Sequence, residues 1–275
     1  MDNKSAESAT YVSDGHKSIE KNEIREILDE YVAKYESLEF IENDPILIPH
    51  EYSLLQDIEI TAFWTSMLSW GQRKTIINNA RKLFNLMDNA PYEFITQHTE
   101  QDRARFERFV HRTFQATDAL YFLEFFQNYY KTHHSLEEAF TSGMKSDDTH
   151  TENALLNFHK TFFDSDFAPH RTRKHVSTPP KSTCKRLNMF LRWMVRDSKR
   201  GVDFGLWKNI GSHQLLIPLD VHVERTAREL GLLTTPQRNW KSVLELTENL
   251  RQFDGGDPVK YDFALFGLSV NKWEI

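Results

Sequence analysis

Asp220 occupies a position in the sequence from which a carboxylate could do chemistry. It follows the apolar run LIPL, in which Pro218 ends an extended approach, and it precedes the amphipathic stretch VHVERTARELGL. The pattern places Asp220 at the start of a predicted helix, where its carboxylate faces the helix N-terminus and whatever lies beyond it. Aspartate is also among the residues most favoured at a helix N-cap, so the position has a purely structural explanation as well.

Lys185 is the second residue of this kind, because it opens the stretch KRLNMFLRWMVR. The apolar residues of this stretch form one helical stripe, which consists of Leu187, Phe190, Leu191, Met194 and Val195. An amine in the first turn of a helix lies near the positive end of the helix dipole, which favours its nucleophilic form. The structural alternative is a solvated cationic helix start. We expect Arg186, Arg192 and Arg196 to project away from the apolar stripe.

A third group, WGQRK at 70–74, lies at a predicted junction between two helices. Gln72 could pair with base edges, Arg73 could hold a phosphate, and Trp70 could stack on an extruded base. A buried tryptophan beside a helix C-cap glycine is the structural alternative. We expect Trp70, Gly71 and Gln72 on a loop at the mouth of a cleft, where Gln72 could fill the gap left by a flipped nucleotide.

Helices are the elements that must position these residues. Apolar spacing of three and four residues predicts helices at about 19–37, 55–69, 73–88, 91–97, 102–110, 117–131, 135–143, 151–163, 184–196, 220–232, 238–252 and 257–270. FIENDPILIPHEYS at 40–53, with two prolines, is predicted to be an extended connector, and no strand is predicted. Residues 1–18 are polar and are predicted to form a disordered tail.

The bulk composition favours a cytoplasmic globular protein. The chain has 275 residues and one cysteine, Cys184, so it can form no internal disulfide and no cysteine-rich metal or iron–sulfur site. The N-terminus lacks the apolar segment of a signal peptide, and no stretch reaches the roughly 18 apolar residues of a membrane span. His-Glu-x-x-His and Cys/His ligand spacings are also missing, so we expect no membrane contact, no metal and no cofactor.

Charge is distributed unevenly in a chain whose formal net charge is −6. Residues 1–50 contain five Lys and Arg against twelve Asp and Glu, whereas residues 171–200 contain ten Lys and Arg against the single Asp197. A polyanion could therefore meet the second segment while avoiding the first. We expect 171–200 to form the principal positive face of the fold and to make any DNA affinity fall steeply with salt.

Short motifs in the second half of the sequence resemble one known superfamily. PLDVH at 218–222 is similar to the Pro-Val-Asp-Val-His type of motif that carries the aspartate of the helix-hairpin-helix DNA glycosylases, in its oxoguanine glycosylase form. KRLN at 185–188 is similar to the Lys-Thr-Ala-Asn that carries the lysine of endonuclease-III-like members. Segments 257–270 and 60–84 resemble the last core helix and the early helix-loop-helix. The chain as a whole also resembles a bacterial family of conserved hypothetical proteins, which implies no function.

The resemblance implies an all-α fold of two helical lobes with a cleft between them, within one domain over 19–275. Lobe one would cover about 50–180, and lobe two about 19–49 plus 181–275. The implied function is that of a DNA base-excision glycosylase, with AP lyase activity on a damaged duplex. In this reading Asp220 and Lys185 are the catalytic residues.

The resemblance also implies DNA contacts from Lys181, Thr183, Arg186 and His222. The hairpin departs from the superfamily, however, because Lys181 and Thr183 in PPKSTCK stand where glycines let backbone amides approach a phosphate closely. The alternative function is therefore a non-catalytic nucleic-acid-binding or protein-interaction module that retains the fold. The two hypotheses separate on whether the Lys185 amine and the Asp220 carboxylate face a common cleft.

Overall fold

The computed structural model describes residues 20–270, so the predicted tail at 1–18 lies outside the described residues. The first half of this range contains α1 (Lys21–Tyr35), α2 (Leu38–Ile41), α3 (Leu47–His50), α4 (Leu55–Leu68), α5 (Arg73–Asn85), α6 (Pro91–Gln97), α7 (Glu100–Arg103), the 3₁₀ helix η1 (Ala104–Phe106), the strands β1 (Val110–His111) and β2 (Phe114–Gln115), and α8 (Ala116–Tyr129). The second half contains α9 (Glu137–Thr141), α10 (Glu152–Phe162), η2 (His170–Lys174), α11 (Lys185–Val195), η3 (Ser212–Gln214), α12 (Val221–Glu229), α13 (Trp240–Arg251), η4 (Pro258–Lys260) and α14 (Tyr261–Val270).

The predicted all-helical character is confirmed, with two local corrections. The segment 40–53 is not extended, since it contains α3 and the end of α2. Asp44 Oδ1 accepts a hydrogen bond from the Ile46 amide at 3.2 Å, and this starts the turn that leads into α3. The second correction is the hairpin β1–β2, in which Val110 pairs with Gln115. Strands of two residues are too short to produce an alternating pattern.

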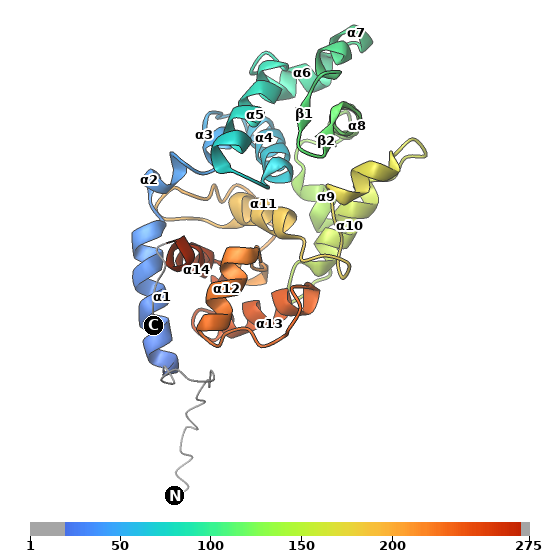
Figure 1. The fold of residues 1–275 in the computed structure, drawn as a ribbon. Coiled ribbons are helices and arrows are strands. Elements are labelled where there is room, and N and C mark those ends of the chain that lie inside the picture. The colour runs from blue at the N-terminus through green and yellow to red at the C-terminus, as the bar shows by residue number, and fades with distance from the viewer. Residues whose placement is uncertain (1–19, 271–275) are drawn as a thin grey trace, which may run out of the picture.

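The helices gather on two sides of α11 (Figure 1). In that view α3, α4 and α5 lie above α11, whereas α12, α13 and α14 lie below it. Helix α11 contacts α4, and α14 contacts both α1 and α12, so the first helix packs with the last ones. Gly267 of α14 makes this packing close, because a Cβ at that position would lie 2.4 Å from the Tyr35 ring of α1.

Helix α4 is the centre of the core. Every residue from Ile58 to Leu68 is buried, which is why its apolar residues do not form a single stripe. The Phe63 ring lies within 5.8 Å of five other phenylalanine rings, measured between centroids, those of Phe122, Phe126, Phe158, Phe162 and Phe190. These rings come from α8, α10 and α11, so α4 is fixed on several sides and its C-terminal end has a defined place.

Arg192 in α11 and Arg196 at its C-cap are both buried. Arg192 and Arg196 are each only 4% exposed and lie in a buried ionic network rather than in solvent. Arg192 pairs with Asp203 and Asp262, and Arg196 pairs with Glu36, Asp203 and Asp257. These carboxylates come from three separate parts of the chain, so the helical pattern of α11 alone cannot reveal them.

The hairpin β1–β2 is fixed by a buried carboxylate, that of Asp118 in α8. Asp118 accepts hydrogen bonds from the Gln115 amide at 2.9 Å and the Thr172 hydroxyl at 2.7 Å. Arg171 lies 3.1 Å and His175 3.4 Å from the same carboxylate. Burial alone would raise the pKa of Asp118, but hydrogen bonds from His175, Gln115 and Thr172 outweigh it and lower the pKa to about 2.

Asp118→Asn is expected to destabilise the protein by about 2 kcal/mol at neutral pH, since a native pKa near 2 in place of 3.8 corresponds to that difference. Because the native pKa is lowered, the contribution is complete above about pH 4 and disappears as the pH falls toward 2. Urea unfolding of both proteins at several pH values measures this. Asp147→Asn at an exposed position is the matched control. If the difference in unfolding free energy between Asp118→Asn and the wild type stays constant with pH, the role of the Asp118 charge is contradicted.

Candidate active site

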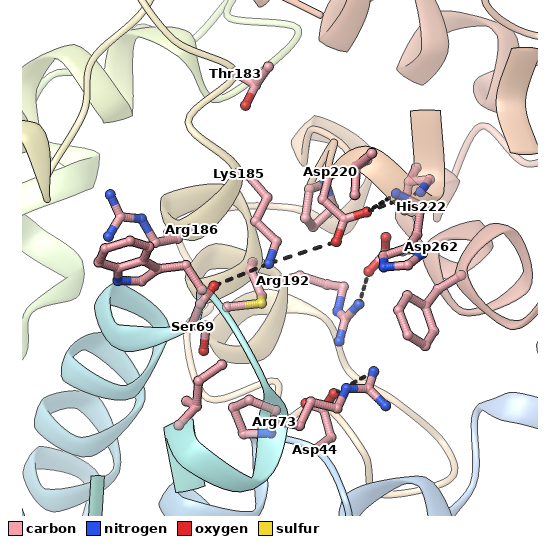
Figure 2. A pocket seen from close by; sticks show the side chains of 18 of the residues that line it. Asp44, Ser69, Arg73, Thr183, Lys185, Arg186, Arg192, Asp220, His222 and Asp262 are labelled. Carbon is pink, nitrogen blue, oxygen red and sulfur yellow. Dashed lines mark hydrogen bonds and ion pairs between the residues drawn. The ribbon is translucent and has the colours of Figure 1, made fainter. Parts of the chain in front are cut away.

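A cavity of about 790 Å³ opens where α11 meets α12 and α14 (Figure 2). Its opposite wall comes from the end of α4, the turn before α5 and the segment around Asp44. The cavity therefore has walls from segments far apart in the sequence. It receives most of the side chains that the sequence singles out.

Lys185 and Asp220 face each other across this cavity, with Lys185 Nζ 3.9 Å from Asp220 Oδ2. Asp220 is the N-cap of α12, as predicted, and its Oδ1 accepts hydrogen bonds from the backbone amides of His222 at 2.8 Å and Val223 at 3.1 Å. One carboxylate oxygen is thus held by the helix, which leaves the other directed at the amine. The two side chains are 27% and 26% exposed, so a ligand in the cavity can reach both.

Lys185 is placed by two local features. Cys184, the residue before α11, has φ 50° and is fully buried, so the chain turns sharply into the helix at a fixed point. At the other end of the side chain, Lys185 Nζ lies 3.5 Å from the Ser69 carbonyl oxygen at the C-terminus of α4. Carbonyl groups at a helix C-terminus attract cations, so the central helix helps to hold the amine in the cavity.

Asp262 of α14 is a charged residue of the cavity lining that the sequence did not single out. Its carboxylate contacts the Arg192 guanidinium, which connects the cavity to the buried network (Figure 2). Burial raises the pKa of Asp262 to about 6, against the lowering effect of Arg192, and the nearby Asp220 carboxylate adds to the rise. A lone aspartate in the apolar stretch YDFALFGLSV was the available sequence signal.

Arg186 lines the cavity, but its guanidinium is already occupied. It donates to the Met67 carbonyl at 2.7 Å and to the Lys174 carbonyl at 3.0 Å. Burial lowers the pKa of Arg186 to about 10. Arg186 therefore braces α11 against the end of α4, while its remaining N–H groups are not used by these two bonds.

The WGQRK residues are divided between the cavity and the surface. Trp70 and Gly71 line the cavity, and the guanidinium of Arg112 lies 4.6 Å from the centroid of the Trp70 ring. Arg73 also lines the cavity, but it pairs with Asp44 at 3.1 Å and stacks on the Phe266 ring at 4.4 Å. Arg73 as a phosphate ligand stays a prediction, and a phosphate would have to compete with the Asp44 carboxylate.

Gln72 is exposed at the start of α5 and does not line the cavity. We expect Gln72→Ala to lower activity on paired DNA more than on single strands, since a side chain that fills the gap of a flipped nucleotide matters only in a duplex. Turnover on matched duplex and single-stranded substrates measures this, with Gln101→Ala on α7 as control. Equal losses on both substrates would reject the wedge role.

The remaining predicted DNA contacts are also divided. Thr183 and His222 line the cavity, and His222 Nδ1 lies 3.1 Å from the Ser269 hydroxyl of α14. Lys181 is exposed and lies outside the lining. The structure thus brings the predicted residues Trp70, Arg73, Thr183, Lys185, Arg186, Asp220 and His222 to one cavity, and leaves Gln72 and Lys181 outside it.

Four of the ten cations in 171–200 do not contribute freely to the predicted positive face. Arg171 pairs with Asp118, and both Arg192 and Arg196 are buried among carboxylates. Arg186 is engaged by backbone carbonyls. The excess of positive charge in this segment is therefore partly neutralised by acidic residues from elsewhere in the chain.

Within residues 20–270 no helix is long and apolar enough to cross a membrane, and no three His, Cys, Asp or Glu side chains are grouped so as to hold a metal ion. Residues 44–271 match the family described as "Protein of unknown function (DUF2400)", and the chain belongs to that family. No curated protein and no solved structure matches the chain.

Proposed function

We propose that this protein is a DNA base-excision glycosylase with associated AP lyase activity. The observation that carries the proposal is the Lys185 amine and the Asp220 carboxylate 3.9 Å apart in one accessible cavity. The volume of about 790 Å³ is in the range of roughly 300–1,000 Å³ in which small-molecule sites fall. The lining contains five Lys and Arg against three carboxylates, in a chain of formal net charge −6, so it favours an anionic substrate.

The two residues have complementary roles in the proposed reaction. Loss of a base passes through an oxocarbenium-like sugar, and Asp220 supplies the fixed negative charge that stabilises it. The Lys185 amine attacks C1′ while the bond from C1′ to the base nitrogen breaks, and the base leaves with the electron pair and takes up a proton. The sugar ring then opens to a Schiff base on Lys185, and β-elimination breaks the C3′–O bond of the strand.

The same proposal includes a glycosylase-like division into two helical lobes, about 50–180 and about 19–49 plus 181–275. Its support is the contact of α1 with α14, which joins the two ends of the described chain. The cavity walls agree with it, since Trp70 lies in the first of these parts while Asp220 and Asp262 lie in the second. A nucleotide drawn from a duplex would enter between them.

The second candidate is a module that binds nucleic acid or protein without excision. Lys181 and Thr183, which stand in place of hairpin glycines, favour it. Neither residue can offer the close backbone approach to a phosphate that glycine allows. The geometry of Lys185 and Asp220 supports the enzyme, because both side chains are accessible from the same cavity, as the reaction requires.

Borohydride trapping tests the proposal. The chain is incubated with duplexes that carry oxidised, deaminated or alkylated bases or an abasic site, and the reductant converts a Schiff base into a stable protein–DNA adduct. We expect an adduct and a cleaved strand with at least one duplex. If the whole panel gives neither, the enzyme proposal fails, and gel-shift titration of the same duplexes measures the binding function that remains.

A further inference from the structure

The cations around the cavity are not equally free to bind a phosphate. Arg73 and Arg192 are neutralised by aspartates, and Arg186 is bound to two carbonyls. By contrast, no ion pair within the described range 20–270 involves Arg112 or Lys174, and both side chains are exposed. Arg112 and Lys174 are therefore positively charged side chains near the cavity that have no carboxylate partner among the described residues.

Arg112 lies at the turn of the β1–β2 hairpin and contacts two residues that line the cavity, although it does not line the cavity itself. Its guanidinium stacks over Trp70 at 4.6 Å, and a Cβ on Gly71 would lie 2.7 Å from Arg112 Nη1. Gly71 has φ +110°, a conformation that side-chain-bearing residues rarely adopt, so a glycine here both forms the turn and leaves room for the arginine. Both Trp70 and Gly71 line the cavity.

The hairpin is a rigid support for this arginine. Asn79 of α5 lies 2.8 Å from His111 on one strand, and Arg171 donates to the Thr113 carbonyl at 2.8 Å in the turn. Arg171 belongs to η2, which ends at Lys174, and Lys174 lines the cavity. The hairpin and η2 therefore present Arg112 and Lys174 from one connected surface.

The lining residues between Lys174 and Arg186 carry charge of one sign. The lining carboxylates Asp44, Asp220 and Asp262 come from the segment before α3, from α12 and from α14. The stretch from the end of η2 to the start of α11 contributes Lys174, Lys185 and Arg186, together with the hydroxyls of Ser177, Ser182 and Thr183. Lysine, arginine and hydroxyl side chains are the groups that contact phosphate oxygens in protein–DNA complexes.

We propose that Arg112 and Lys174 form a phosphate-binding rim that holds the DNA backbone beside the extruded nucleotide. This inference rests on the proposed function and deepens it. The rim supplies the backbone contact that the hairpin glycines provide in the superfamily and that Lys181 and Thr183 replace here. Trp70, stacked under Arg112, supports the guanidinium from below and keeps it at the mouth.

The test is the salt dependence of binding to an undamaged duplex, measured by fluorescence anisotropy for the full chain. The logarithm of the binding constant falls with the logarithm of salt concentration, and each phosphate contact adds about 0.9 to the steepness of that fall. The double variant R112Q/K174Q is therefore expected to reduce the steepness by about 1.8. The charge-matched control is K208Q/K241Q, at two exposed lysines outside the cavity lining, and it should leave the slope unchanged. R112K keeps the charge and should also retain the slope.

An unchanged slope in R112Q/K174Q, or an equal fall in the control variant, would overturn the rim, since the DNA would then bind elsewhere or respond only to net charge. This readout does not require cleavage. If the protein cleaves no lesion but R112Q/K174Q shows the expected slope difference, the rim is supported and the glycosylase proposal fails. If the protein cleaves a lesion but the slope is unaltered in R112Q/K174Q, the glycosylase proposal is supported and the rim fails.

Discussion

Lys185→Gln is expected to abolish the borohydride-trapped adduct, because a Schiff base requires a primary amine and glutamine has none. The side chain is 27% exposed and its contacts are one long hydrogen bond to Ser69 and one ion pair to Asp220, so the fold should be retained. The measurements are adduct yield on a denaturing gel and thermal unfolding of the same preparation.

Lys208→Gln is the matched control for this variant, since it removes an exposed lysine outside the cavity lining. It should trap DNA as the wild type does. If Lys185→Gln still forms the adduct at wild-type yield, another amine is the nucleophile. The cavity would then need a different role.

Asp220→Asn is expected to lower the rate of base excision by about 10²–10³, or roughly 3–4 kcal/mol in activation free energy. Asn removes the negative charge that we propose stabilises the sugar, but it keeps an oxygen that can accept from the His222 and Val223 amides. Because Asn and Asp are comparable N-caps, stability should change little. Single-turnover excision and urea unfolding measure the two effects separately.

Asp220→Ala is a useful companion to this variant, because it removes both the charge and the cap. It should lower the rate of base excision by a similar factor, and it should also lower the free energy of unfolding by about 1 kcal/mol. Full activity of Asp220→Asn on a substrate that the wild type cleaves would contradict the catalytic role of the carboxylate. It would leave Asp220 as a helix cap alone.

The sequence predicts the site best where the signal is local. Asp220 was expected at an N-cap, and Lys185 was expected at a helix start. Both positions depend on a few neighbouring residues, and the structure confirms them. That the two meet in one cavity is a long-range fact, and only the resemblance to a superfamily could suggest it. Most of the helices follow from apolar spacing and agree with the structure within a few residues. The helix predicted at about 102–110 is wrong, because that segment contains only the end of α7, η1 and the first residue of β1.

The predictions that fail depend on distant partners. Arg192 and Arg196 look like solvated cations on their own helix, but Glu36, Asp203, Asp257 and Asp262 neutralise them from elsewhere in the chain. The partner of Arg73 is hidden from the sequence for the same reason, because Asp44 is close in space but not in sequence. The prediction of no strand is wrong for another reason. The strands of the β1–β2 hairpin have only two residues each, so they carry no usable periodicity.

The contact between α1 and α14 has a consequence for how the protein is made. During synthesis α1 leaves the ribosome long before α14, and at 5–20 residues per second the interval is roughly 10–50 s. Throughout that time the apolar face of α1, formed by Ile24, Leu28 and Val32, has no helix to cover it. The contact that covers this face therefore forms only after nearly the whole described chain has been made.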